Sequence, residues 1–163
     1  MFEIFSERAR RVVLAARMKA GRRGASTIEV TDLLFAIVME DDDQKFGAYL
    51  QGSFGDGSGT LMSFGSHTRF LAPEVASELL AQLERMAAHG EPISNEADMP
   101  IAADVGQTFQ KAKEMQEEMR HKSVGPLHLL AAILSVPSEI ADLVRRSGIT
   151  EEMVKQRLRE EAT

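Results

Sequence analysis

VGPLHLLAAIL, residues 124–134, decides the fold, because a close copy of it, IEVTDLLFAIV, stands at residues 28–38. In the earlier copy, Thr31 or Asp32 is expected to cap a helix whose apolar residues cover most of its circumference, which predicts a central, buried position. The same kind of helix occurring twice in one chain indicates an internal duplication.

The duplication extends beyond these two stretches. When the second half is shifted back by 96 positions, apolar residues of the two halves coincide, while the polar residues mostly differ. Phe5 then falls on Ile101, Val13 on Phe109 and Leu33 on Leu129. Shared apolar positions without shared polar ones indicate two diverged copies of one packing scheme. We therefore predict two pseudo-equivalent four-helix units packed into one body with a seam between them.

Helical periodicity accounts for most of the remaining chain, and no convincing strand alternation occurs. Ser6 is the expected N-cap of the first helix, and Gly21 and Gly24 are expected to end it. The fold class is therefore all-α, with about eight helices, predicted over residues 6–23, 31–38, 44–51, 73–89, 102–120, 126–134, 138–147 and 150–160. As domain organisation we expect one domain over residues 1–163, with repeat one at 1–90 including a long loop at 51–70, a linker at 91–98, and repeat two at 99–163.

Composition narrows the class of protein. The 163 residues are 44% hydrophobic and contain no Cys, which fits a globular core and excludes disulfides and thiolate metal sites. Neither a bilayer-spanning apolar run nor a secretory signal is found, so we expect a soluble, cytoplasmic protein with no membrane contact. The net charge of -6 disfavours nucleic-acid binding, since phosphate contacts depend on cationic side chains.

Candidate chemistry is sparse. The four His residues lack a spacing typical of metal ligands, and no P-loop motif is present, so we expect no metal, no cofactor and no enzyme activity. His128 lies just inside a predicted helix start, where a structural hydrogen bond is the expected role. The acidic run Glu40–Asp43 lacks the spaced ligands and glycine of a calcium loop, and is interpreted as a solvated turn.

The pattern of Phe5-Ser6-Glu7-Arg8-Ala9, followed by Val12, Val13, Ala16, Ile28 and Leu33-Leu34, resembles the N-terminal domain of the Clp ATPases, closest to the ClpC and ClpB type. Val124-Gly125, His128-Leu129-Leu130 and Ala132-Ile133-Leu134 repeat the resemblance. It covers nearly all of the chain except residues 51–70.

The resemblance implies a protein-binding domain that recruits substrates or adaptor proteins to a Clp-type ATP-dependent unfoldase or protease, without chemistry of its own. Protein or peptide substrates and adaptor proteins are then the expected partners. The alternative is a stand-alone accessory or regulatory subunit that docks on a Clp ATPase or peptidase core. The two differ in whether the native chain continues into an ATPase.

The sequence departs from the resembled family at one functional position in each repeat. In the ClpC-like members, a glutamate precedes the signature histidine, but here Thr31 and Leu127 take those places, and Asp32 replaces the first histidine. A carboxylate that would pair with a guanidinium is thus missing from both repeats, which argues against phosphoarginine recognition of that kind.

Aromatic residues at two places complete the candidate binding set. Those before the first helix either close the helix entry as a hydrophobic staple or contact a partner. Those around the glycine-rich loop either fold over the seam or contact another chain. With the two positions at which the sequence departs from the resembled family, the candidate residues for peptide or adaptor binding are Phe2, Phe5, Thr31, Phe54, Phe64, Phe70 and Leu127.

Overall fold

The computed structural model describes residues 2–54, 67–94 and 97–161, and this part of the chain is all-α, as the sequence predicts. A short 3-10 helix, η1 (Phe2–Ile4), precedes eight α-helices in the described residues. These are α1 (Glu7–Arg22), α2 (Val30–Asp41), α3 (Asp43–Phe54), α4 (Pro73–Met86), α5 (Ala103–Met119), α6 (Pro126–Ser135), α7 (Glu139–Arg146) and α8 (Glu151–Glu161).

Two four-helix units follow each other along the chain, and the spacing of their helices confirms the duplication. α1, α2 and α3 begin at residues 7, 30 and 43, and α5, α6 and α7 begin at 103, 126 and 139, in each case 96 positions later. α4 and α8 begin at 73 and 151, only 78 positions apart. The first unit is therefore longer than the second between its third and fourth helices.

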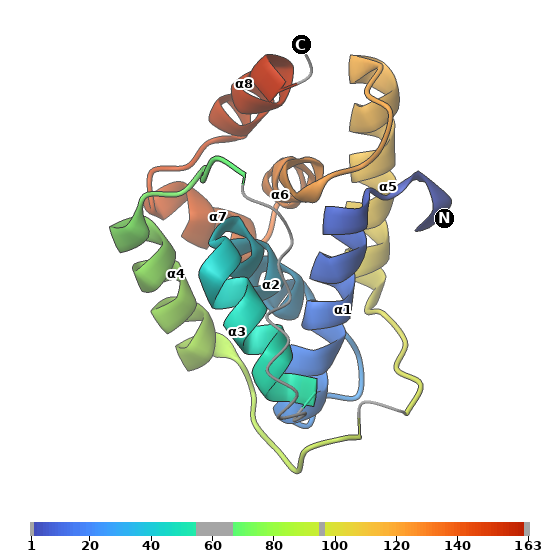
Figure 1. Ribbon diagram of the computed structural model, residues 1–163, viewed down its shortest axis with the longest axis vertical. Coiled ribbons are helices and arrows are strands. Elements are labelled where there is room, and N and C mark those ends of the chain that lie inside the picture. Colours follow the sequence, from blue (N-terminus) through green and yellow to red (C-terminus); the bar gives the residue numbers. More distant parts are fainter. Residues whose placement is uncertain (1, 55–66, 95–96, 162–163) are drawn as a thin grey trace.

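The core is organised around α2 and α6, which lie in the middle of the molecule with the other helices around them (Figure 1). Leu33, Leu34 and Ile37 of α2, with Leu129 and Ile133 of α6, are each no more than 2% exposed. Burying such side chains contributes roughly 1.5–3 kcal/mol each, so these two helices supply much of the stability of the fold. The prediction of a central helix is confirmed for α2 and holds for its copy as well.

The two units exchange backbone hydrogen bonds across the seam in a matched way. The peptide N–H of Ser6 donates to the oxygen of Val124 at 2.8 Å, and the N–H of Val124 donates to Ile4 at 2.7 Å. At the positions 96 residues away, Ala102 donates to Ile28 at 2.8 Å and Ile28 donates to Pro100 at 3.0 Å. The segment before the first helix of each unit thus pairs with the segment before the second helix of the other, giving two parallel bridges.

Helix starts agree with the predictions in one case and correct them in another. Ser6 is the N-cap of α1, and its hydroxyl accepts a hydrogen bond from the N–H of Ala9 at 3.1 Å. The N-cap of α2, however, is Glu29 rather than Thr31 or Asp32. The Asp32 carboxylate acts from within the first turn, accepting the Glu29 N–H at 2.9 Å, because α2 begins two to three residues earlier than a cap at Thr31 or Asp32 implies.

The acidic run at the end of α2 is not the solvated turn that the sequence suggests. Glu40 and Asp41 are only 4% and 7% exposed. The Glu40 carboxylate accepts two hydrogen bonds from the Arg8 guanidinium, at 2.7 and 2.9 Å. Asp41 accepts the peptide N–H groups of Phe70 and Leu71 at 2.8 and 3.0 Å, so it fixes the chain as it approaches α4.

Within the described residues, no single helix is both long and apolar enough to cross a bilayer. α6 and α7 meet the length and composition test only when taken together, and they are bent by 109° at the break between them.

Candidate functional site

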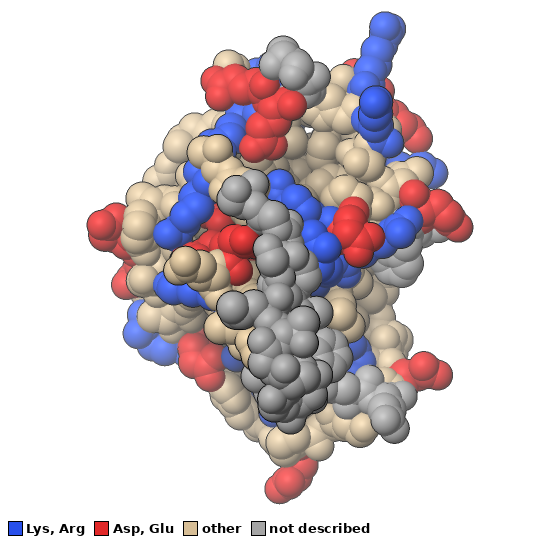
Figure 2. Space-filling view, viewed as in Figure 1, with Lys and Arg blue, Asp and Glu red and all other residues tan. Residues whose placement is uncertain are grey.

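A groove with a volume of about 560 Å³ opens where the end of α5, the start of α6, the start of α1 and the end of α8 come together. It is a hollow near the top of Figure 2, with acidic side chains over α8 on one side and basic side chains over the end of α5 on the other. We call it the α5–α6 groove. It is lined by Ser6, Arg8, Met119, Arg120, His121, Lys122, Ser123, Gly125, Pro126, Leu127, His128, Leu158 and Glu161.

Two histidines form one wall of this groove. His128, in the first turn of α6, accepts the peptide N–H of Gly125 through Nδ1 at 2.9 Å. Its Nε2 lies 2.8 Å from Nδ1 of His121 in the preceding loop, and the rings meet nearly edge to face. Since Nδ1 of His128 accepts, its Nε2 carries the proton and donates to His121. The pair is therefore a neutral, directional link between the α5–α6 loop and α6.

Burial, and to a smaller extent the neighbouring His121, lower the pKa of His128 to about 4. The side chain is only 4% exposed, so a charged ring would lose most of its hydration. The predicted structural role of His128 fits this geometry, in which both ring nitrogens are engaged within the protein.

Charges at the groove fall into paired and unpaired groups. Arg8 is held by Glu40, and Glu161 is held by Arg157 at 3.0 Å. Arg120 and Lys122 are exposed, and within the part of the chain that the structure describes neither side chain has an ion-pair partner. The groove therefore presents uncompensated positive charge along the wall formed by the end of α5 and the following loop.

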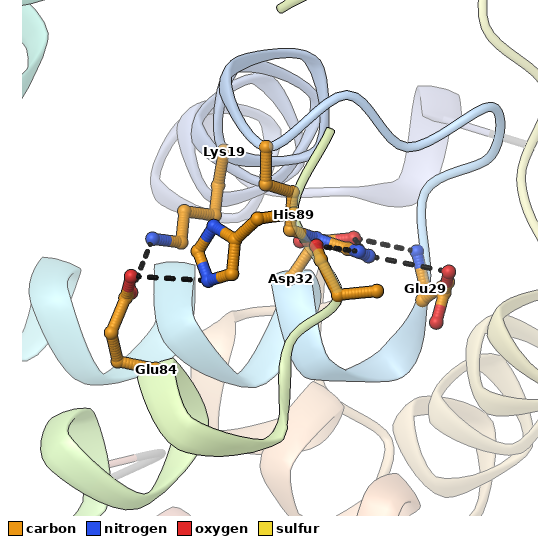
Figure 3. A network of polar contacts seen from close by, with 7 residues as sticks. Lys19, Glu29, Asp32, Glu84 and His89 are labelled. Carbon is orange, nitrogen blue, oxygen red and sulfur yellow. Dashed lines mark hydrogen bonds and ion pairs between the residues drawn. The ribbon is translucent and has the colours of Figure 1, made fainter. Parts of the chain in front are cut away.

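The equivalent place in the first repeat is built differently (Figure 3). Asp32 stands where His128 stands in the second repeat, and two nitrogens of the Arg23 guanidinium, Nε and Nη2, donate to its carboxylate at 2.7 and 2.8 Å. The chain beyond α4 lies against the end of α1, with Gly90 N–H donating to Arg23 at 2.7 Å and Ile93 N–H donating to Gly21 at 2.7 Å. The backbone of residues 88–93 thus covers in repeat one the end of α1 that corresponds to the groove wall of repeat two.

Structural comparison finds the same arrangement in solved domains. The N-terminal domain of the caseinolytic protease associated chaperone ClpD from Arabidopsis thaliana aligns with a TM-score of 0.62 and 22% identity, covering 97% of this chain and 99% of that one. The Hsp104 N-terminal domain from Candida albicans aligns with a TM-score of 0.61 and 16% identity, covering 94% and 87%. This chain has a Clp-N-like fold.

A third structure, from an investigation of a malarial protein secretion system, aligns with a TM-score of 0.69 and 18% identity, covering 97% of this chain and 94% of that one. Comparison of the sequence with protein-family models gives no match, and comparison with curated proteins gives none either. The Clp-N-like character therefore rests on the arrangement of the helices, which the apolar repeat also predicts.

The Clp-N-like fold places the predicted binding residues in different surroundings. Leu127 is half-buried and lines the α5–α6 groove. Phe70 is half-buried beside α8, outside that groove. Thr31 is half-buried at the start of α2, and its hydroxyl has no hydrogen-bond partner among the described residues. Phe5 is 3% exposed and packs edge to face on Phe109, with ring centroids 5.3 Å apart, so almost none of its side chain is available to a partner.

The side chains of three predicted binding residues lie outside the described part of the structure. Phe2 lies in η1 and Phe54 ends α3, but their side chains lie outside the described part of the structure, as does the whole of Phe64.

Sequence reasoning missed the polar residues of the groove. Arg120, His121 and Lys122 were not among the expected contacts, although all three come directly before the copied stretch that defines the second repeat. A signal for them existed in the repeat itself, since the segment between the first two helices of each unit must pass close to the start of the second helix.

Proposed function

We propose that this chain is a protein-binding module that recruits protein substrates or adaptor proteins to a Clp-type ATP-dependent unfoldase or protease, and that it has no chemistry of its own. The observation that carries the proposal is the α5–α6 groove. It combines apolar side chains, Met119, Leu127 and Leu158, with a polar rim, which is the composition of sites that bind peptides.

The structural comparisons also support a role as a protein-binding module. One structural neighbour is described as the N-terminal domain of a chaperone associated with caseinolytic protease, and the likeness spans nearly the whole of this chain. The ion pairs of Arg8 with Glu40 and of Arg23 with Asp32 tie the two ends of α1 to α2. A rigid frame lowers the entropic cost of binding, because fewer groups must be ordered when a partner arrives.

A substitution at Leu127 tests the proposed function. The partner would be a fluorescein-labelled, reduced and carboxymethylated protein that cannot fold, with binding followed by fluorescence anisotropy. Leu127→Asp is expected to weaken binding roughly tenfold, because a half-buried leucine contributes about 1–2 kcal/mol of apolar contact. An acidic residue in the first turn of α6 suits the helix dipole, so the fold is expected to remain intact.

Gln44→Asp is the matched control, since Gln44 is exposed and stands at the second position of α3, as Leu127 does in α6. Equal binding by both variants and the unchanged protein would move the site elsewhere, and absence of any binding to unfolded protein would reject the function. To separate recruitment from the accessory role, the chain would be purified with its partners from its own cells. A species near 18.0 kDa that brings down a Clp ATPase or peptidase would support the accessory role.

A further inference from the structure

The charges of the α5–α6 groove point to a particular kind of occupant. Its acidic member, Glu161, is already paired with Arg157, while the cations Arg120 and Lys122 have no ion-pair partner among the described residues. We propose that the groove preferentially accepts peptide segments that carry aspartate or glutamate side chains, a specificity that rests on the proposed function.

The backbone of Arg120 supports a role for its guanidinium. Arg120 ends α5 in the left-handed conformation, with φ 59° and ψ 36°, and it is the one non-glycine residue of the described part of the chain with positive φ. For a residue with a Cβ this conformation is less favourable than the right-handed one, and glycine usually takes this place at helix ends. An arginine here is therefore unfavourable for folding alone, and its side chain projects from the rim of the groove.

The apolar part of the groove limits the occupant further. Met119 and Leu127 are half-buried, so part of each side chain remains available for contact, and both lie close in sequence to the unpaired cations. A segment in which acidic side chains alternate with apolar ones would satisfy both kinds of surface. A nucleic acid would match the cations but not the apolar floor, and the net charge of -6 would oppose its approach.

The asymmetry between the repeats places this specificity in the second unit. In repeat one the corresponding end of α1 is covered by residues 88–93, and the positions 96 residues before Arg120 and Lys122 are the uncharged Gly24 and Ser26. In repeat two these positions carry Arg120 and Lys122, and both line the groove. We expect one acidic segment to bind at this place per chain.

The test uses two fluorescein-labelled peptides of leucine and acidic residues, one with glutamate throughout and its counterpart with glutamine in place of every glutamate. Anisotropy titrations are made with the whole chain at neutral pH and at low and raised ionic strength. The glutamate peptide is expected to bind roughly tenfold more tightly at low ionic strength, since its carboxylates can pair with both Arg120 and Lys122, and salt should reduce the difference.

Arg120→Gly/Lys122→Ala should abolish the preference for glutamate while leaving the melting temperature unchanged or higher, because glycine relieves the left-handed strain. Lys45→Ala/Arg146→Ala removes the same charge from exposed positions on α3 and α7 and should retain the preference. The specificity is overturned if the two peptides bind equally, if both double variants lose the preference alike, or if single-stranded RNA binds more tightly than the glutamate peptide.

These titrations also separate the two proposals. If the unfolded protein binds but the two peptides do not differ, the acidic specificity fails and the proposed function stands. If the unfolded protein and both peptides fail to bind, both proposals are rejected.

Discussion

His128, at the start of α6, makes the free energy of unfolding depend on pH. The unfolded chain binds a proton at this residue near pH 6.5, whereas in the folded protein the pKa is about 4. Between these values the unfolded state holds more protons, so the contribution is fully present above pH 6.5 and is lost as pH falls toward 4. The difference corresponds to about 3 kcal/mol of unfolding free energy.

The measurement is urea denaturation of the protein and of His128→Asn at neutral pH and near pH 4.5. Asn keeps an acceptor for the Gly125 N–H but does not titrate, so the variant should lose less stability on acidification, although it starts from a lower value at neutral pH. Parallel loss in the two proteins would show that other groups dominate the acid response.

Asp32 and Glu84 offer a second comparison at the residue scale, because Figure 3 shows both in one network while their burial differs. The Arg23 and Asp32 side chains are 3% and 1% exposed, and the Glu84 side chain is 56% exposed beside Lys19. Asp32→Asn should cost about 3–5 kcal/mol, since the buried Arg23 would keep only the half-exposed Glu29 carboxylate, 3.3 Å away, as its counter-charge. Glu84→Gln should cost less than about 1 kcal/mol. Denaturant titration measures both free-energy changes. Similar values for the two variants would contradict the view that burial makes the Asp32 ion pair more important for stability than the Glu84 ion pair.

At the scale of the helices, the turn after α1 depends on a glycine, because the chain after α4 approaches Gly24 closely. Gly148 also has a positive φ but has no such neighbour, so it serves as the control. Gly24 has φ 75°, and a Cβ there would stand 2.5 Å from the Glu91 oxygen; Gly148 has φ 92° with no atom within 4 Å of its Cβ position. Gly148→Ala should cost about 1–2 kcal/mol of backbone strain. Gly24→Ala should cost clearly more, because the chain after α4 must also move. Equal shifts in thermal melting would mean that this chain segment yields freely.

The helices were predictable because their signals are local. Apolar spacing and caps such as Ser6 lie within one or two turns, and the offset of 96 residues identified which helices correspond. The polar anchors were not predictable in this way. Asp41 and Glu40 look like a solvated acidic run until Phe70 and Arg8, about 30 residues away in either direction, supply their partners. Likewise, nothing local distinguishes Phe5 in the core from a surface aromatic.

At the scale of the whole molecule, the two units depend on each other for their seam. The segments before α1 and before α5 each pair with the opposite unit, and the Phe5 ring from repeat one rests on Phe109 from repeat two. Each unit alone would leave two segments without their partners, the one before its first helix and the one before its second helix. We therefore expect the two repeats to unfold as one cooperative body and not as two independent domains.

Hydrogen exchange can measure this coupling at two backbone amides that lie outside any helix. The N–H groups of Ile28 and Val124 donate across the seam at 3.0 and 2.7 Å. If the seam opens only when the whole molecule unfolds, both amides should exchange with the global free energy of unfolding, as amides in α2 and α6 do. Phe46→Ala, which empties a site in α3 where the phenylalanine is 1% exposed, should lower the global stability by about 3–5 kcal/mol. Although α3 belongs to repeat one, protection of Val124 in repeat two should then fall by the same amount as protection of Ile28. Protection of Val124 that stays unchanged in this variant would mean that the second repeat holds its structure while the first one opens.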